Sequence, residues 1–203
     1  MAAVLLTLTV ILSLAGSEWI DSLYYRERSI LSFPAAPRSA WRLPLLIVGF
    51  GGASLWMSCT TFSLAVLTGK LCLAYFLFLT LCTDWEQQLI FDRMQLAFAL
   101  LTFLFIPCPE WHPLNHFLAA LLGGGGFLLL ALVTGGGVGG GDIKFMAVLG
   151  LWLGTAGLFD VVLKGFILSG LVAIIMLLGG QWRRNDRLAY SPYFSVAAIY
   201  HLL

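Results

Sequence analysis

Charged residues are scarce in this sequence. Only 10% of its 203 residues are Asp, Glu, Lys or Arg, and 60% are hydrophobic, whereas a soluble domain carries about 25% charged residues. So little charge excludes an ordinary water-soluble enzyme or adaptor. The net charge is +1, and no block of basic residues indicates nucleic-acid binding.

Cysteines are also few, and their spacing excludes the usual cysteine-based sites. Cys59, Cys72, Cys82 and Cys108 are isolated from one another, and no C-x-x-C pair occurs. Zinc sites and disulfide frameworks need matched or closely spaced cysteines. We therefore expect no metal and no cofactor, and we expect these thiols to pack within a membrane core.

Long apolar runs take up most of the chain. A membrane-spanning helix needs roughly 20 mainly apolar residues, and polar or proline-containing stretches divide this chain into about eight runs. No Lys or Arg precedes Arg26, so the first run is expected to be an uncleaved helix rather than a signal peptide. The sequence thus predicts an all-α, polytopic membrane protein with a single domain over residues 1–203. The predicted runs are 2–25, 44–68, 71–83, 94–106, 114–133, 143–157, 159–179 and 189–203.

Cationic residues are unevenly distributed among the predicted loops. Of the 11 Lys and Arg residues, all except Lys70 and Lys164 fall in or beside the loops that follow odd-numbered runs. Cationic residues concentrate on the cytoplasmic side of a bilayer. We therefore expect the odd loops to face the cytoplasm and both termini to face outward.

The most unusual stretch is the glycine-rich segment, residues 135–141, which contains six glycines and one valine. Such a stretch buries little apolar surface and leaves the backbone free to bend, so we expect a loop. Asp142 follows it and opens the next apolar run. Asp84 ends the third run on the same predicted membrane face. An ionisable residue at the membrane boundary indicates a functional site.

Two carboxylates that approach closely provide complementary chemistry. Both cannot ionise without cost, so one keeps a proton at neutral pH and the pair supplies an acid and a base. Such a pair can activate water against a peptide carbonyl and protonate the leaving amine. Asp84 and Asp142 are therefore predicted to be a catalytic pair, with the two roles unassigned. Gly139 and Gly141 would let a substrate backbone pass close to Asp142.

The two aspartates lie in segments that resemble motifs of a known family. Residues 139–144, Gly-Gly-Gly-Asp-Ile-Lys, resemble the G-x-G-D-x-K signature of type IV prepilin peptidases, the bacterial branch of the GxGD intramembrane aspartyl proteases. Residues 84–92 resemble the other family motif, in which an acidic residue follows the first Asp by two positions and Pro-Asp or Pro-Asn closes the stretch. By this match the catalytic aspartates fall on Asp84 and Asp142. The supporting motif positions are Glu86, Asp92, Gly139, Gly141 and Lys144.

The resemblance implies an activity and a substrate. The chain would be an aspartic endopeptidase that cleaves the leader of type IV prepilins or pseudopilins, at the cytoplasmic face of the bacterial inner membrane. Phe91 departs from the family pattern, which usually has proline there. Loop 26–43 is short and lacks cysteine, whereas bifunctional members carry a zinc-binding insert there that is linked to N-methylation of the pilin. We therefore expect no methyltransferase activity.

Alternative interpretations remain at this level. A small ion- or proton-coupled transporter could use the same carboxylates, with the glycine-rich segment as the hinge of a broken helix. Against it, the carboxylates lie at predicted helix ends and no internal repeat is evident. A non-catalytic assembly partner is a third interpretation. Lys144 could position substrate or tune Asp142, or it could be a cation that snorkels at a helix end.

Overall fold

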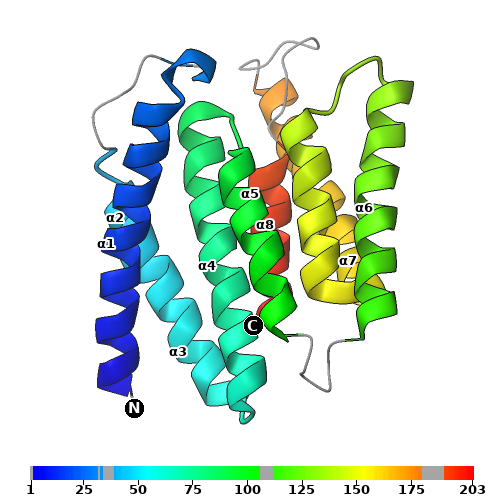
Figure 1. The fold of residues 1–203 in the computed structure, drawn as a ribbon. Helices are drawn as coiled ribbons and strands as arrows, with labels where there is room; N and C mark the ends of the chain where they lie inside the picture. Colours follow the sequence, from blue (N-terminus) through cyan, green and yellow to red (C-terminus); the bar gives the residue numbers. More distant parts are fainter. Residues whose placement is uncertain (1, 32, 34–38, 106–111, 180–189) are drawn as a thin grey trace. The chain divides into compact units, whose positions relative to one another are not determined.

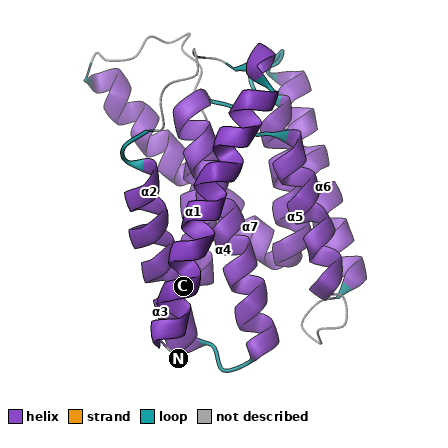
Figure 2. Ribbon diagram, turned by 60° about the vertical axis from the view of Figure 1, so that its left-hand side comes forward, coloured by secondary structure: helices purple, strands orange, loops and turns teal. Residues whose placement is uncertain are grey.

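The structure, a computed structural model, describes residues 2–31, 33, 39–105, 112–179 and 190–203. Every regular element within these ranges is a helix (Figures 1 and 2). The prediction of an all-α fold is therefore confirmed. Cys108, part of loop 26–43 and the arginines of loop 180–189 lie outside the described residues, and the predictions that concern them remain untested.

Five helices within the described ranges are long and apolar enough to cross a membrane. This confirms the polytopic character, but it does not confirm the predicted count of about eight. Two of the predicted runs form helices of only 11 and 12 residues, α5 (Asp92–Thr102) and α8 (Ser191–Leu202). Two others belong to one helix, α7 (Gly140–Leu178). The five candidate spans are Val4–Arg26, Arg42–Thr60, Leu64–Gln87, Pro113–Val133 and Gly140–Leu178.

The chain forms two compact units, Met1–Phe91 with Leu202–Leu203, and Asp92–His201. The first unit consists of three helical segments and a short 3-10 turn. Its middle segment is continuous, because a short helix passes through a π-helical turn into a longer helix. The elements are α1 (Ala2–Arg26), η1 (Arg28–Ile30), α2 (Arg42–Pro44), η2 (Leu45–Phe50), α3 (Gly51–Thr60) and α4 (Leu64–Gln87).

Hydrogen bonds give the directions of the three segments. Tyr75 of α4 donates to the Leu12 carbonyl of α1, and Tyr24, farther along α1, donates to Glu86, farther along α4. These two helices therefore run in the same direction. Arg42, which begins the middle segment, reaches the end of α1, so the middle segment runs back between them.

The break between the second and third predicted spans lies earlier than the sequence predicts. The pattern predicts a tight turn at Gly69 and Lys70, but α4 continues through both residues. The Ser63 hydroxyl instead accepts the N–H of Val66 and caps the start of α4. A capping hydroxyl satisfies a backbone donor that a helix start leaves open. A glycine inside a long apolar helix costs only about 1 kcal/mol, so the cap sets the boundary.

The second unit contains the remaining helices, which alternate in direction. Gln95 and Phe98 of α5, the first helix of this unit, bond to Gly141 and Trp152 of α7, the third helix. The two contacts follow the same order along both helices. The first and third helices therefore start at the same end of this unit. The elements are α5 (Asp92–Thr102), η3 (Phe103–Phe105), α6 (Pro113–Val133), α7 (Gly140–Leu178) and α8 (Ser191–Leu202).

Helix α7 reverses direction at Gly154, where φ is 67° and ψ is −178°. This conformation is almost restricted to glycine. Parts 140–153 and 155–178 consequently run in opposite directions along α6 and form a hairpin (Figure 1). The close pairs are Gly150 with Ala119 and Ala147 with Gly124 before the reversal, and Leu158 with Gly123 and Phe166 with Phe127 after it.

The sequence predicts the break between the sixth and seventh runs near residue 158 rather than at Gly154. Three glycines, Gly150, Gly154 and Gly157, lie close together there, and their spacing gives no reason to prefer one. Only Gly154 adopts a positive φ. The other two pack closely against neighbours. A Cβ added to Gly150 would overlap the Ala119 backbone at 2.5 Å, and one added to Gly157 would crowd Leu153 at 3.0 Å.

Candidate active site

Asp84 lies in the last turn of α4 and is 5% exposed. The helix ends at Gln87, and Gln88 follows in a left-handed conformation with φ 52°. The Gln88 N–H donates to the Asp84 carbonyl at 2.8 Å. This left-handed cap closes the helix end and fixes the backbone that carries the carboxylate. The third run is therefore longer than the predicted range 71–83, because α4 continues past Asp84 to Gln87.

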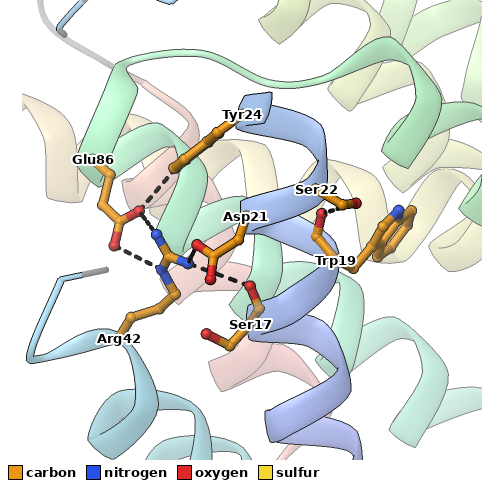
Figure 3. A network of polar contacts seen from close by, with 7 residues as sticks. All are labelled: Ser17, Trp19, Asp21, Ser22, Tyr24, Arg42 and Glu86. Carbon is orange, nitrogen blue, oxygen red and sulfur yellow. Dashed lines mark hydrogen bonds and ion pairs between the residues drawn. The ribbon is translucent and has the colours of Figure 1, made fainter. Parts of the chain in front are cut away.

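A buried ion-pair network surrounds Glu86, two residues after Asp84 (Figure 3). Arg42 is 1% exposed, and its Nε and Nη2 donate to the two Glu86 oxygens at 2.9 and 2.5 Å. Its Nη1 donates to Asp21 at 2.5 Å, and the Tyr24 hydroxyl donates to Glu86 at 2.9 Å. A two-pronged guanidinium–carboxylate pair is among the stronger polar contacts in proteins. The network ties α1, α2 and α4 together near Asp84.

The glycine-rich segment forms a turn that leads into α7. Gly135 and Gly136 have φ values of 62° and 91°, and Gly139 is the N-cap in an extended conformation. Helix α7 begins at Gly140. The predicted loop is therefore correct for the first part of the segment and wrong for its last two residues, which are helical. Asp142 lies in the first turn, where the helix dipole favours a carboxylate.

Three residues surround the backbone of Asp142. A Cβ added to Gly139 would lie 3.5 Å from the Asp142 Oδ2, an ordinary contact distance, so Gly139 lies directly beside this carboxylate. The Gly141 carbonyl accepts a hydrogen bond from the Gln95 Nε2 at 3.1 Å. Sequence reasoning did not single out Gln95, which is buried in the structure. An amide within the apolar part of the predicted run 94–106 was the one signal that could have drawn attention to it.

Lys144 and Asp92 form an ion pair at the shared starting end of α5 and α7. The Lys144 Nζ lies 2.7 Å from each Asp92 oxygen, and both side chains are exposed. The structure thus brings together two residues that the motifs place apart in sequence. An exposed pair of this kind contributes about 0–1 kcal/mol to stability, so it is weak evidence for a structural role.

A groove of about 490 Å³ begins at this ion pair and lies between α5 and the first part of α7. Its charged end adjoins the first turn of α7, and the rest of its wall is mainly apolar. The groove can therefore accept an apolar segment whose polar end stays near Asp142. The lining residues are Asp92, Arg93, Gln95, Leu96, Ala99, Lys144, Ala147, Val148 and Leu151.

The two predicted catalytic residues belong to different units, Asp84 to the first and Asp142 to the second. Asp84 lies at the end of α4 and Asp142 at the start of α7. Gln88 donates to the Asp84 carbonyl, and Gln95 donates to the carbonyl of Gly141, the residue before Asp142. Within the described ranges, no group of three or more His, Cys, Asp or Glu side chains could hold a metal ion.

Comparison with known proteins gives one match. The model of the type IV leader peptidase family matches residues 71–176, which is just over half of the chain. The matched range includes both segments that contain Asp84 and Asp142. No curated protein and no solved structure matches the chain.

Proposed function

Since this chain belongs to the type IV leader peptidase family, we propose that it is an aspartic endopeptidase that cleaves the leader of type IV prepilins or pseudopilins. One observation carries the proposal: the family match at residues 71–176 contains both aspartate motifs. The helical, membrane-spanning character of the chain supports it, because an enzyme for a membrane-anchored substrate needs to lie in the bilayer.

Asp84 and Asp142 are the proposed catalytic residues. One carboxylate, in its ionised form, takes a proton from water as the water attacks the scissile carbonyl. The other, in its protonated form, donates to the leaving amine. The position of each residue at a helix end supports these roles, since a helix end at the membrane boundary lies nearer to water and to a peptide than the middle of a span does. Glu86 is a weaker candidate, because Arg42 and Tyr24 already bond both of its oxygens.

The proposal extends to location and architecture. We place the enzyme in the bacterial inner membrane with Asp84 and Asp142 facing the cytoplasm, and the two units work as a single peptidase domain. The lack of cysteine in loop 26–43 supports leader cleavage without N-methylation. Gly139, Gly141, Lys144, Glu86 and Asp92 support the site, and the substrate backbone would pass beside Asp142 at Gly139, which lies next to that carboxylate.

The experiment is cleavage of a prepilin by the purified protein in proteoliposomes. Asp84→Asn and Asp142→Asn each keep the side-chain size but remove the titrating group. Each change is expected to lower kcat by at least about 10²-fold, the range of one general acid or base. Asp160→Asn is the matched control. Asp160, in the second part of α7, bonds Lys164 of the same helix and His201 of α8. It lies outside the proposed chemistry, so this change is expected to leave kcat within about twofold of native.

The possible results separate the interpretations. Near-native cleavage by either folded active-site variant would show that its aspartate is misassigned. If the native protein cleaves none of a panel of prepilins and pseudopilins, the peptidase proposal fails, and the result favours the transporter interpretation.

A further inference from the structure

Gln95 is a buried polar residue that joins two helices next to Asp142. Its side chain is 3% exposed and extends from α5 toward the start of α7. Its Nε2 donates to the carbonyl of Gly141 at 3.1 Å. Gly141 directly precedes Asp142, so this bond holds the peptide unit from which the carboxylate projects.

The amide oxygen of Gln95, Oε1, lowers the stability of the fold instead of raising it. Its Oε1 is buried and has no hydrogen-bond partner among the described residues. A buried acceptor without a partner loses its hydration and regains nothing. An apolar side chain of similar length would avoid this loss, so the free energy of folding alone does not explain a glutamine here.

The packing of α5 against α7 does not explain Gln95 either. The indole Nε1 of Trp152 donates to the Phe98 carbonyl at 3.1 Å, and Lys144 pairs with Asp92. These two contacts already join α5 to α7. Neither of them bonds to the backbone of the turn that carries Asp142, whereas the Gln95 bond does.

We propose that Gln95 is a positioning residue that fixes the first turn of α7 and thereby the direction of Asp142. In an α-helix that begins at Gly140, the N–H of Phe145 also points to the Gly141 carbonyl. A carbonyl has two lone pairs and can accept both donors. With Gln95 in place, this carbonyl keeps one orientation, although the glycine-rich turn before it has few side-chain contacts to hold it. The consequence for catalysis rests on the proposed function, but the fixing of the turn does not.

The test compares Gln95→Met with Trp152→Phe, which removes the other neutral hydrogen bond between α5 and α7. For each variant we would measure steady-state prepilin cleavage in proteoliposomes, the thermal unfolding midpoint, and hydrogen–deuterium exchange of residues 139–147. A misplacement of about 1 Å costs up to about 10²-fold in rate. We therefore expect Gln95→Met to lower kcat about tenfold to a hundredfold, with KM within about twofold of native.

Stability and exchange distinguish positioning from packing. Gln95→Met is expected to keep or raise the unfolding midpoint, since it removes the buried Oε1, and to speed exchange at the Phe145 amide. Trp152→Phe is expected to leave both kcat and this exchange unchanged. Gln95→Asn keeps the amide but is one methylene too short to reach Gly141, so it should resemble Gln95→Met in kcat and in Phe145 exchange, although its buried amide should lower the unfolding midpoint. It provides a second variant if the methionine variant does not fold.

Three outcomes would overturn the proposal. The first is native kcat in a folded Gln95→Met variant. The second is a fall in kcat together with a lower unfolding midpoint and faster exchange throughout the measured segment, which is the result of a packing role. The third is unchanged exchange at the Phe145 amide in Gln95→Met. This outcome can be read even if the native protein cleaves no prepilin. In that case the peptidase proposal fails by itself, and faster Phe145 exchange still supports the positioning of the turn.

Discussion

At the scale of single residues, Arg42 is a buried cation that several polar groups of the first unit surround. Its guanidinium bonds Glu86 twice and Asp21 once, and it also contacts the Ser17 carbonyl and the face of the Tyr24 ring. Moving these charges out of water is costly, so the network contributes little net stability while it is intact. Removing Arg42 is a different matter, because it leaves the largely buried Glu86 carboxylate, 9% exposed, without its charged partner.

Arg42→Met is therefore expected to destabilise the protein by about 3–5 kcal/mol, the range for breaking a buried pair from one side. Tyr24→Phe removes a single hydrogen bond to a charged group and should cost about 1.5–3 kcal/mol. The measurement is unfolding in mixed detergent micelles. Arg28→Met is the control: Arg28 is exposed and lies over the Tyr25 ring at 4.6 Å, so a change within about 0.5 kcal/mol is expected. An equal loss for both arginine variants would refute the special position of Arg42.

The site shows what residue patterns can and cannot predict. Asp84 and Asp142 were predicted from charged residues at the ends of apolar runs and from the motifs that contain them. The pairing of Lys144 with Asp92 and of Arg42 with Glu86 could not be predicted, because each joins positions far apart in the chain. Gln95 escaped notice because an uncharged amide in an apolar run has no local signature.

At the scale of elements, helix limits depended on caps and single backbone angles that composition does not encode. The apolar runs predicted most of the helices correctly. The start of α4 depends on the Ser63 hydroxyl, and the reversal of α7 depends on the positive φ of Gly154. Several serines and glycines nearby could have filled either role, so hydropathy alone placed these boundaries a few residues away.

The reversal of α7 gives a prediction at this scale. Gly154→Ala forces a side chain into a conformation that costs about 1–3 kcal/mol, and the added Cβ would lie 2.6 Å from the Asn115 Nδ2. We expect a clear loss of stability and of folded yield. Gly170→Ala in the same helix is the matched control, because no atom lies within 4 Å of its added Cβ. It should raise stability by about 0.5–1 kcal/mol, the advantage of alanine over glycine inside a helix. The measurement is the unfolding midpoint of each variant under the same conditions. An equal change in midpoint for Gly154→Ala and Gly170→Ala would show that α7 does not need glycine at its reversal.

At the scale of the whole molecule, composition alone predicted the class, because 60% hydrophobic residues leave a membrane fold as the only way to bury so much apolar surface. Membrane orientation is the prediction that belongs to this scale. The alternating helices of the first unit place Ser29, after α1, and Phe62, after α3, at opposite ends of that unit. The distribution of cations predicts that Ser29 faces the cytoplasm and Phe62 the outside.

Single-cysteine labelling tests this orientation in a background without the four native cysteines. Phe62→Cys, at a fully exposed position, should react with a membrane-impermeant maleimide in cells whose outer membrane is permeabilised. Ser29→Cys, also exposed, should react only after lysis. The reversed pattern would place Asp84 on the outer side, because Arg42 and Tyr24 hold the end of α4 at the same end of the unit as the end of α1. A cytoplasmic peptidase would then be excluded, whatever the two aspartates do.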